Sequence, residues 1–245
     1  MCEKKYKLNI DPRILELLGP SLYTNIYYII AELVANAYDA DAHNVYIIDN
    51  DNNITVEDDG NGMSYQGGDI KKYLNVASVS RTSEEDAITA LGRKKMGRKG
   101  VGKLAALSVS DNVLVKTMVS NEKSGFVLSR FVNEDRLLQA IDESEIKFEN
   151  ISQHGTSIVM LNPKYKLHAT VKAIRRNLLK LFPMVSEDFK IHIIRGTEEC
   201  TISNFDKDMI GELSTLITLG DEFQYLTDNF KTDYPQMKLE LCNSR

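Results

Sequence analysis

The stretch IIAELVANAYDADA, residues 29–42, organises the rest of the chain. If this stretch is a helix, Glu32, Asn36 and Asp39 are spaced i, i+4 and i+7 and share one face. The residues that can pack into a core lie largely on the other faces and are Ile26, Ile30, Leu33, Val34 and Ala37. A helix that presents a carboxylate, an amide and a second carboxylate along one face contacts either solvent or a polar ligand.

The composition is that of an ordinary globular protein. The chain has 245 residues, of which 42% are hydrophobic and 27% are charged. This is enough for one large domain, or for one domain and part of another. The net charge of -5 argues against attraction of the whole surface to nucleic acid, although a local basic patch could still bind it.

The cysteines and the N-terminal segment bear on the cellular compartment. Cys2, Cys200 and Cys242 are odd in number, far apart and in no metal-ligand spacing, as expected in a reducing compartment. Residues 1–13 lack the apolar segment of a signal peptide, and no apolar run reaches membrane-spanning length. We therefore expect a cytoplasmic protein with no membrane partner.

Hydrophobic periodicity and turn residues predict alternating helices and strands. Helices are expected from a cap at Ser21 to about residue 40, at 69–76, within 133–150 and at 168–182. Strands are expected at 44–49, 53–57, 112–119, 125–131, 156–161 and 189–194. Residues 1–20 form a lead-in in which Asp11 caps a turn at Pro12, and residues 197–245 have no assigned structure.

Two segments are too polar or too rich in glycine for regular structure. Residues 58–63, DDGNGM, form a tight acidic loop, and residues 77–99 form a polar and basic one. A loop of about 20 residues in a compact domain is usually a lid or a binding segment. Within it, residues 93–95 are expected to be exposed.

The glycine segment 97–103 superficially resembles a P-loop. Its pattern G-x-x-x-x-G-K is followed by Leu104, where a P-loop carries the Ser or Thr that holds Mg²⁺. The preceding residues 92–96, GRKKM, cannot form the buried strand that a P-loop requires. The P-loop is therefore rejected. Three glycines before an apolar helix start at 104–107 still let backbone N–H groups approach an anion.

Four motifs in order resemble the GHKL ATPases, the family of Hsp90, MutL, DNA gyrase B, MORC proteins and histidine kinase catalytic domains. They are E-x-x-x-N-x-x-D-A at 32–40, D-x-G-x-G-M at 58–63, G-x-x-G-x-G at 97–102 and Gly155-Thr156 at the start of a strand. The resemblance is greatest to the Hsp90, MutL and MORC branch. It implies an α/β fold, a two-layer Bergerat-type sandwich with a mixed β-sheet, helices on one face and a mobile ATP lid. It covers about residues 20–195, so we expect a domain at 21–195 and a C-terminal extension at 196–245.

The resemblance implies roles for the polar face of the helix. Glu32 corresponds to the general base that activates the attacking water, and Asn36 to the Mg²⁺ ligand. An amide is a reasonable single ligand because Mg²⁺ keeps most of its waters and takes other oxygens from phosphates. A carboxylate one turn earlier can reach a water aligned on the γ-phosphate. Asp39 either supports the pocket or touches the nucleotide, and the sequence leaves both roles open.

The resemblance also implies a set of nucleotide-binding residues. Asp58 accepts a hydrogen bond from the adenine amino group, and a carboxylate, which only accepts, discriminates against the guanine oxygen. Thr156 is expected near that carboxylate. The remaining contacts to purine and phosphates are assigned to Gly60, Gly62, Met63, Gly97, Lys99, Gly100, Val101, Gly102 and Lys103.

Together these features predict Mg²⁺-dependent ATP binding and slow hydrolysis, used as a conformational or dimerisation switch. Two alternatives stay open: a nucleotide-sensing module without significant ATPase activity, and a histidine-kinase-type phosphotransferase. Relatives carry a second domain that supplies a lysine to the γ-phosphate, and the 50 or so residues after the last predicted strand are too few for one. We therefore expect a fragment of a larger protein, or another source of the lysine. A protein or DNA partner would act through the missing effector domain, and ATP could promote a homodimer.

Overall fold

The structure is a computed structural model that describes residues 4–9, 25–75, 88–96, 102–120, 122–131, 135–181 and 188–203. In these residues nine strands form one sheet with the order β1-β6-β5-β4-β7-β3-β2-β8-β9. The strands are β1 Tyr6–Lys7, β2 Asn44–Asn50, β3 Asn53–Asp58, β4 Asn112–Val119, β5 Glu122–Ser129, β6 Leu137–Ala140, β7 His154–Leu161, β8 Lys190–Arg195 and β9 Glu198–Ile202. β2 and β8 are parallel and the other neighbours are antiparallel, so the sheet is mixed.

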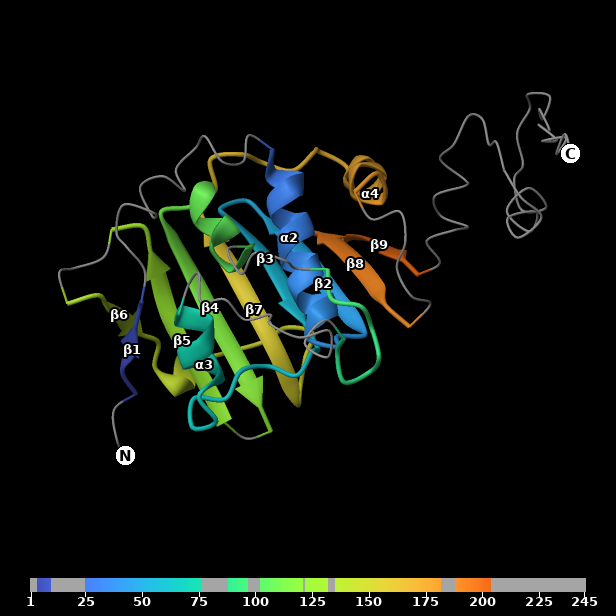
Figure 1. Ribbon diagram of the computed structural model, residues 1–245. Helices are drawn as coiled ribbons and strands as arrows, with labels where there is room; N and C mark the ends of the chain where they lie inside the picture. The colour runs from blue at the N-terminus through green and yellow to red at the C-terminus, as the bar shows by residue number, and fades with distance from the viewer. Residues whose placement is uncertain are drawn as a thin grey trace, which may run out of the picture.

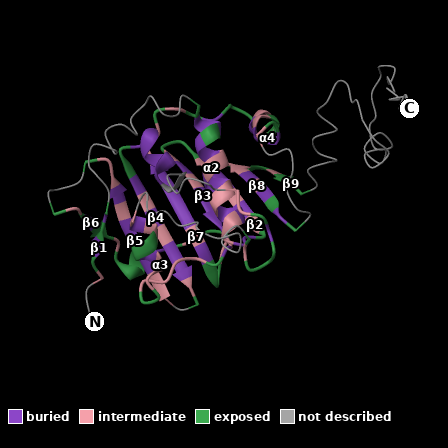
Figure 2. Cartoon of the chain, in the orientation of Figure 1, coloured by how far each residue is buried: buried purple, intermediate pink, exposed green. Residues whose placement is uncertain are grey.

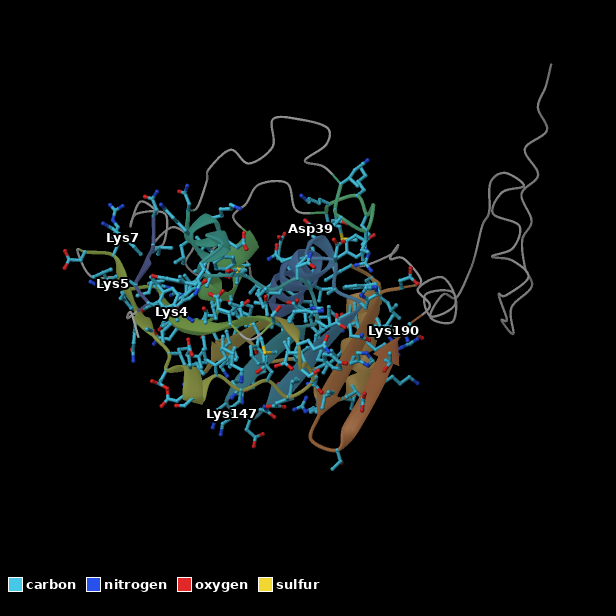
Figure 3. All side chains as sticks on the ribbon, turned by 90° about the horizontal axis from the view of Figure 1, so that it is seen from below. Lys4, Lys5, Lys7, Asp39, Lys147 and Lys190 are labelled. Carbon is cyan, nitrogen blue, oxygen red and sulfur yellow. The ribbon has the colours of Figure 1, made fainter. Side chains whose placement is uncertain are left out.

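The helices form a second layer on one face of this sheet (Figures 1 and 3). That layer contains α2 Ile26–Asp39, α3 Asp69–Leu74, α4 Val171–Leu179 and the 3₁₀ helix η2 Gly102–Ser108. Figure 2 shows buried residues along α2 and the central strands, where the two layers meet. The predicted two-layer α/β fold with a mixed sheet is therefore confirmed.

One apolar row crosses the sheet beneath the helices. The strand registers align six buried side chains, which are Ile193, Ile47, Val56, Ile158, Val115 and Phe126. Each belongs to the same core cluster as the buried face of α2. Burying such a side chain contributes about 1.5–3 kcal/mol, so this row and α2 hold the two layers together.

Helix α2 begins at a well-defined cap. Asn25 has an extended backbone, and its side chain accepts the N–H of Tyr27 at 3.0 Å. The cap is therefore Asn25, and the predicted cap Ser21 lies outside the described residues. At the other end Asp41 has φ +60°, which turns the chain out of the helix toward β2.

The predicted helix within 133–150 is wrong. The described residues there form β6 and a 3₁₀ turn, η3 Glu143–Glu145. β6 pairs with both β5 and β1, and Ile146 is buried against Gly125. Pairing with neighbouring strands outweighs the local preference of this charged stretch.

Two edge strands were not predicted. β1 lies in the lead-in 1–20 and pairs with β6, while β9 lies in the unassigned stretch 197–245 and pairs with β8. A two-residue turn, in which Gly196 has φ +58°, joins β8 to β9. The other predicted strands are present, with ends shifted by up to three residues. The turn at Asp11 and Pro12 lies outside the described residues.

Candidate functional site

A row of polar side chains replaces the apolar row at one end of the sheet. On β3, β7, β4 and β5, the positions two residues beyond the apolar row lie on the same face of the sheet. The strand registers align Asp58, Thr156, Thr117 and Ser124 at these positions. Asp58, Thr117 and Ser124 are buried, and Thr156 is half-buried. A polar row on the helix-covered face of a sheet is unusual, because hydrophobic side chains otherwise fill that layer.

Asp58 ends β3 within this row. It is 7% exposed, and its Oδ1 accepts the N–H of Gly60 at 2.9 Å. Burial raises the pKa of Asp58 to about 7; hydrogen bonds from the backbone N–H groups of Gly60 and Thr156 oppose the rise, and the nearby Asp59 adds to it. Near neutral pH this carboxyl is poised between its neutral form and an ionised form that only accepts hydrogen bonds.

The neighbouring Asp59 has a structural role. Its Oδ1 accepts the backbone N–H groups of His43 and Asn44, each at 2.7 Å, and its Oδ2 accepts the Asn44 side-chain amide at 2.7 Å. Asp59 therefore fixes the start of β2 to the loop after β3.

The glycines of the loop after β3 are required by close packing. A Cβ on Gly60 would lie 2.8 Å from the carbonyl oxygen of Ala40, at the end of α2. Gly62 has φ +67°, and a Cβ there would lie 2.3 Å from the carbonyl oxygen of Met118. This close packing places the loop directly between the end of α2 and β4.

Thr117 connects this loop to the sheet and was missed in the sequence. Its Oγ1 accepts the N–H of Met63 at 2.7 Å and donates to the carbonyl of Gly155 at 3.1 Å. The imidazole of His154 adds a hydrogen bond to the carbonyl of Gly60 at 2.7 Å. The signal available in the sequence was a threonine at an inward position of β4, on the same face of the strand as Val113 and Val115.

Glu122 holds the continuation of the same loop. Its carboxylate accepts the Ser64 hydroxyl at 2.8 Å and the N–H of Tyr65 at 2.7 Å. Partial burial alone would raise the pKa of Glu122, but these hydrogen bonds, one from Gln66 and the charge of Lys4 together lower it. Glu122 therefore stays ionised and orders the chain before α3.

The C-terminal end of α2 lies beside this loop, because Asn61 N–H donates to the carbonyl of Ala40 at 2.8 Å. Glu32, Asn36 and Asp39 are half-buried, whereas Leu33, Val34, Ala37 and Tyr38 on the other faces are buried in the core. Asp39 lies at the C-terminal end of α2, within the helix layer (Figure 3). Its Oδ1 accepts the backbone N–H of Met96 at 2.7 Å. The helix thus has the predicted separation of polar and apolar faces.

Residues 88–96 are the described part of the long loop predicted at 77–99. Ile88 and Lys94 form an isolated antiparallel bridge across a short turn. Lys94 is exposed as expected, but Lys95 is half-buried and Arg93 is only 8% exposed, so the prediction is wrong for these two residues, most clearly for Arg93. The reason is that a guanidinium can be buried against aromatic faces, and here it lies 4.8 Å from the Tyr38 ring.

The glycine segment is described only from its last glycine. Gly97, Lys99, Gly100, Val101 and the Lys103 side chain lie outside the described residues. Gly102 begins η2, and Leu104 to Leu107 are each 1% exposed. The predicted apolar helix start at 104–107 is therefore helical, as a 3₁₀ helix.

A family model described as "Histidine kinase-, DNA gyrase B-, and HSP90-like ATPase" matches residues 23–156, more than half of the chain. The chain belongs to this ATPase family. The match contains α2, the loop after β3, η2 and the first residues of β7, and it includes all four residues of the polar row. The domain is therefore an ATP-binding domain of the GHKL type.

Two relatives are similar to this chain, one over most of its length and the other over about half of it. A protein of Herpetosiphon aurantiacus named "Putative type II restriction enzyme HgiDII" is 29% identical over 228 residues, which are 91% of this chain and 36% of that protein. The "Chaperone protein HtpG" of Buchnera aphidicola subsp. Baizongia pistaciae is 28% identical over 148 residues, which are 49% of this chain and 23% of that protein. The chain thus spans about a third or less of either relative.

The donor set of the ATPase domain suits a metal that is held mainly by its substrate. In the described ranges no three His, Cys, Asp or Glu side chains come together to hold a metal ion. Asn36 offers a single side-chain amide on a half-buried helix face. Mg²⁺ fits such a site, because it accepts few protein ligands and completes its shell with phosphate oxygens and water.

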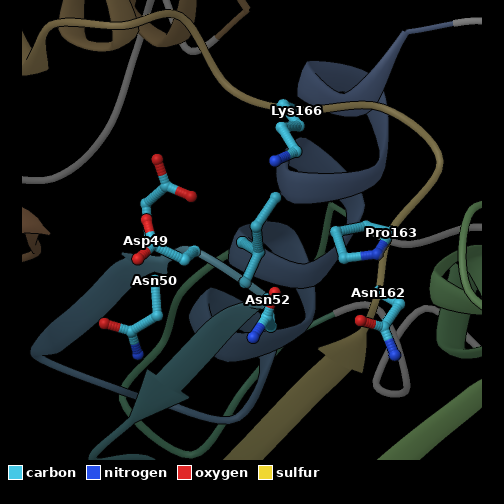
Figure 4. A pocket seen from close by; sticks show the side chains of 8 residues that line it. Asp49, Asn50, Asn52, Asn162, Pro163 and Lys166 are labelled. Carbon is cyan, nitrogen blue, oxygen red and sulfur yellow. The ribbon is translucent and has the colours of Figure 1, made fainter.

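A small hollow lies at the far end of the same sheet (Figure 4). It encloses about 180 Å³ and is lined by Asp49, Asn50, Asp51, Asn52, Ile54, Asn162, Pro163 and Lys166. This is the β2–β3 turn, whereas Asp58 ends β3, so the two are separated by nearly the length of the strand. None of the predicted site residues lines the hollow, and it is smaller than a typical site for a small molecule.

No helix in the described part of the chain has the length and apolar character needed to cross a bilayer.

Proposed function

We propose that this domain binds Mg·ATP against the polar row and the polar face of α2, and hydrolyses it slowly as a conformational switch. The observation that carries the proposal is Asp58, a buried carboxyl with a pKa raised to about 7, in a loop of closely packed glycines. Burial of an acid without an ion pair is costly, and a ligand that donates to it offsets that cost. The adenine amino group is such a donor.

Recognition of the base is assigned to the loop after β3 and to β7. The ionised Asp58 accepts a hydrogen bond from the adenine amino group. It repels the guanine carbonyl oxygen, because the carboxylate and that oxygen are both acceptors and neither can donate a hydrogen. Gly60 and Gly62 keep side chains away from the base. Met63 and Thr156 line the same pocket. Support comes from two hydrogen bonds that fix this loop. One joins the Met63 N–H to the Thr117 hydroxyl, and the other joins the His154 imidazole to the Gly60 carbonyl.

Catalysis is assigned to the polar face of α2. Asn36 holds Mg²⁺, which when bound neutralises phosphate charge. Glu32, one turn earlier, accepts a proton from the attacking water. Asp39 supports the site through Met96. The phosphates are assigned to Gly97, Lys99, Gly100, Val101, Gly102 and Lys103.

The Glu32→Ala variant tests hydrolysis separately from binding. Phosphate release should fall at least about 100-fold, because a general base contributes about 10²–10⁴-fold to such a step, while ATP affinity should change little. Release should also require Mg²⁺. Normal hydrolysis by the variant would contradict the assignment.

Two other results would select the alternatives. If the wild-type domain binds ATP tightly but releases no phosphate with Mg²⁺, it is a nucleotide-sensing module. If labelled γ-phosphate moves to a protein histidine, it is a phosphotransferase.

The similarity to a protein named as a restriction enzyme supports a second proposal, that the ATP state of this domain controls a DNA-acting assembly. The net charge of -5 means that DNA contacts would come from a local patch or from another domain. Phosphate release with and without duplex DNA, and sedimentation with and without a non-hydrolysable ATP analogue, test the DNA and homodimer partners. The cytoplasmic location, the source of a γ-phosphate lysine and the division into 1–20, 21–195 and 196–245 stay predictions.

A further inference from the structure

Arg93 is the one lysine or arginine among the described residues whose side chain is buried. It lies in a turn whose neighbouring residues are exposed, with Leu91 at 55% and Ile88 at 52%. The turn is closed by hydrogen bonds from Thr89 N–H to the Arg93 carbonyl at 2.8 Å and from Gly92 N–H to the Thr89 carbonyl at 3.0 Å. The buried side chain of Arg93 is therefore one of the groups that hold this exposed turn to the rest of the protein.

The guanidinium of Arg93 contacts three different elements. It lies 4.8 Å from the ring of Tyr38 on α2 and 5.7 Å from the ring of Phe189, which precedes β8. The two rings meet edge to face at 5.3 Å. Nη1 donates to the carbonyl of Ala42, in the α2–β2 connection, at 2.6 Å. This combination of stacking and a directed hydrogen bond requires a planar guanidinium, which lysine lacks.

Two backbone hydrogen bonds extend the same attachment. Leu91 N–H donates to Asp41 Oδ2 at 3.3 Å, and Met96 N–H donates to Asp39 Oδ1 at 2.7 Å. Asp39 lies three residues after Asn36 on the polar face of α2. Residues 88–96 are therefore fixed to the C-terminal end of the helix that carries the proposed Mg²⁺ ligand.

We propose that Arg93 is a positioning residue for the triphosphate. It fixes residues 88–96 to the end of α2, and so sets where the chain enters the glycine segment that begins directly after Met96. The proposal rests on the proposed ATP site and assigns to Arg93 the placement of Met96, the residue before the glycine segment, at the end of the helix that carries Asn36. Contacts to the adenine are assigned to Asp58 and its loop, and none of the contacts that the structure describes for Arg93 is with a residue of that loop.

This division predicts a selective defect. In Arg93→Lys the affinity for ATP should fall about tenfold or more, while the affinity for adenosine should stay within about twofold of wild type. The matched control is Arg195→Lys, because Arg195 Nη1 also donates to a carbonyl, that of His168, at 2.6 Å, but at the other end of the sheet. The control should keep both affinities. Titration calorimetry of each variant with ATP and with adenosine, alongside its melting temperature, measures this.

Three outcomes would overturn the proposal: equal losses for ATP and adenosine, no loss for either, or the same loss in Arg195→Lys. If Arg93→Lys does not fold, Phe189→Leu decides, because it removes one aromatic wall and keeps the hydrogen bond to Ala42. It should weaken ATP binding several-fold and leave adenosine binding unchanged. A wild-type domain that binds neither ligand would instead refute the proposed function, and the role of Arg93 with it.

Discussion

At the scale of single residues, the buried carboxyl of Asp58 lowers the stability of the folded protein when it is ionised, which is the form proposed to bind adenine. Its neutral form is favoured in the folded protein, since burial raises its pKa from 3.8 to about 7. A group with a raised folded pKa contributes stability at low pH and loses it as the pH rises through the folded pKa. For Asp58 that window runs from about pH 4 to about pH 7.

The Asp58→Asn variant should expose this linkage. The free energy of unfolding of the wild type, relative to the variant, should fall by a few kcal/mol between pH 4 and pH 7 and then level off, because each pKa unit corresponds to about 1.4 kcal/mol. Urea unfolding at several pH values measures the difference. A difference that rises with pH would show that Asp58 is ionised and stabilising in the folded state.

At the scale of elements, the loop after β3 is the one whose geometry depends most on glycine. Gly62 and Gly68 both have positive φ, +67° and +80°, but only Gly62 would bring a Cβ into contact with other atoms. Replacing either glycine by alanine has the same backbone cost of about 1 kcal/mol. At Gly62 the added Cβ would also clash with the carbonyl oxygen of Met118, 2.3 Å away.

Gly62→Ala should therefore lower the free energy of unfolding by at least about 2 kcal/mol more than Gly68→Ala. Thermal or urea unfolding of the pair provides the measurement, with Gly68→Ala as the control for the backbone cost alone. Equal losses in the two variants would mean that the loop can move away from β4, and that its close packing is not needed.

Elements differ in how far the sequence predicts them. The helix carrying Glu32, Asn36 and Asp39 was predictable because its apolar and polar residues follow the helical period along the whole element. The central strands were predictable because each is a short run rich in β-branched and apolar residues. β1, β6 and β9 are short strands of two to five residues at or next to the edges of the sheet, and nothing in their own residues specifies their partners. Nothing local to them carries that information.

The candidate site shows the same division. Asp58 and its glycines could be selected from their motif, but the polar row requires the register of four strands, which places Thr117 and Ser124 in one row with Asp58. Arg93 was expected to be exposed because it lies in a basic, polar run. Its burial depends on Tyr38 and Phe189, which are distant in the sequence and converge only in the fold.

At the scale of the whole molecule, one mixed sheet with one helical layer brings all of these groups to the same end. The apolar row binds the layers together, and two residues further along β3, β7, β4 and β5 the same face becomes polar. α2 spans both regions, so its buried face stabilises the core while its polar face borders the site. The small hollow at the β2–β3 turn lies at the opposite end of the sheet.

The most direct test of the account is the affinity of the domain for ATP and GTP at pH 8 and pH 6, measured by titration calorimetry with Mg²⁺. ATP should bind at pH 8, and GTP should bind at least about 100-fold more weakly, because its oxygen would face the Asp58 carboxylate. ATP affinity should fall up to about tenfold at pH 6, as Asp58 becomes protonated. Equal affinities for ATP and GTP, or no binding of either nucleotide, would contradict the account.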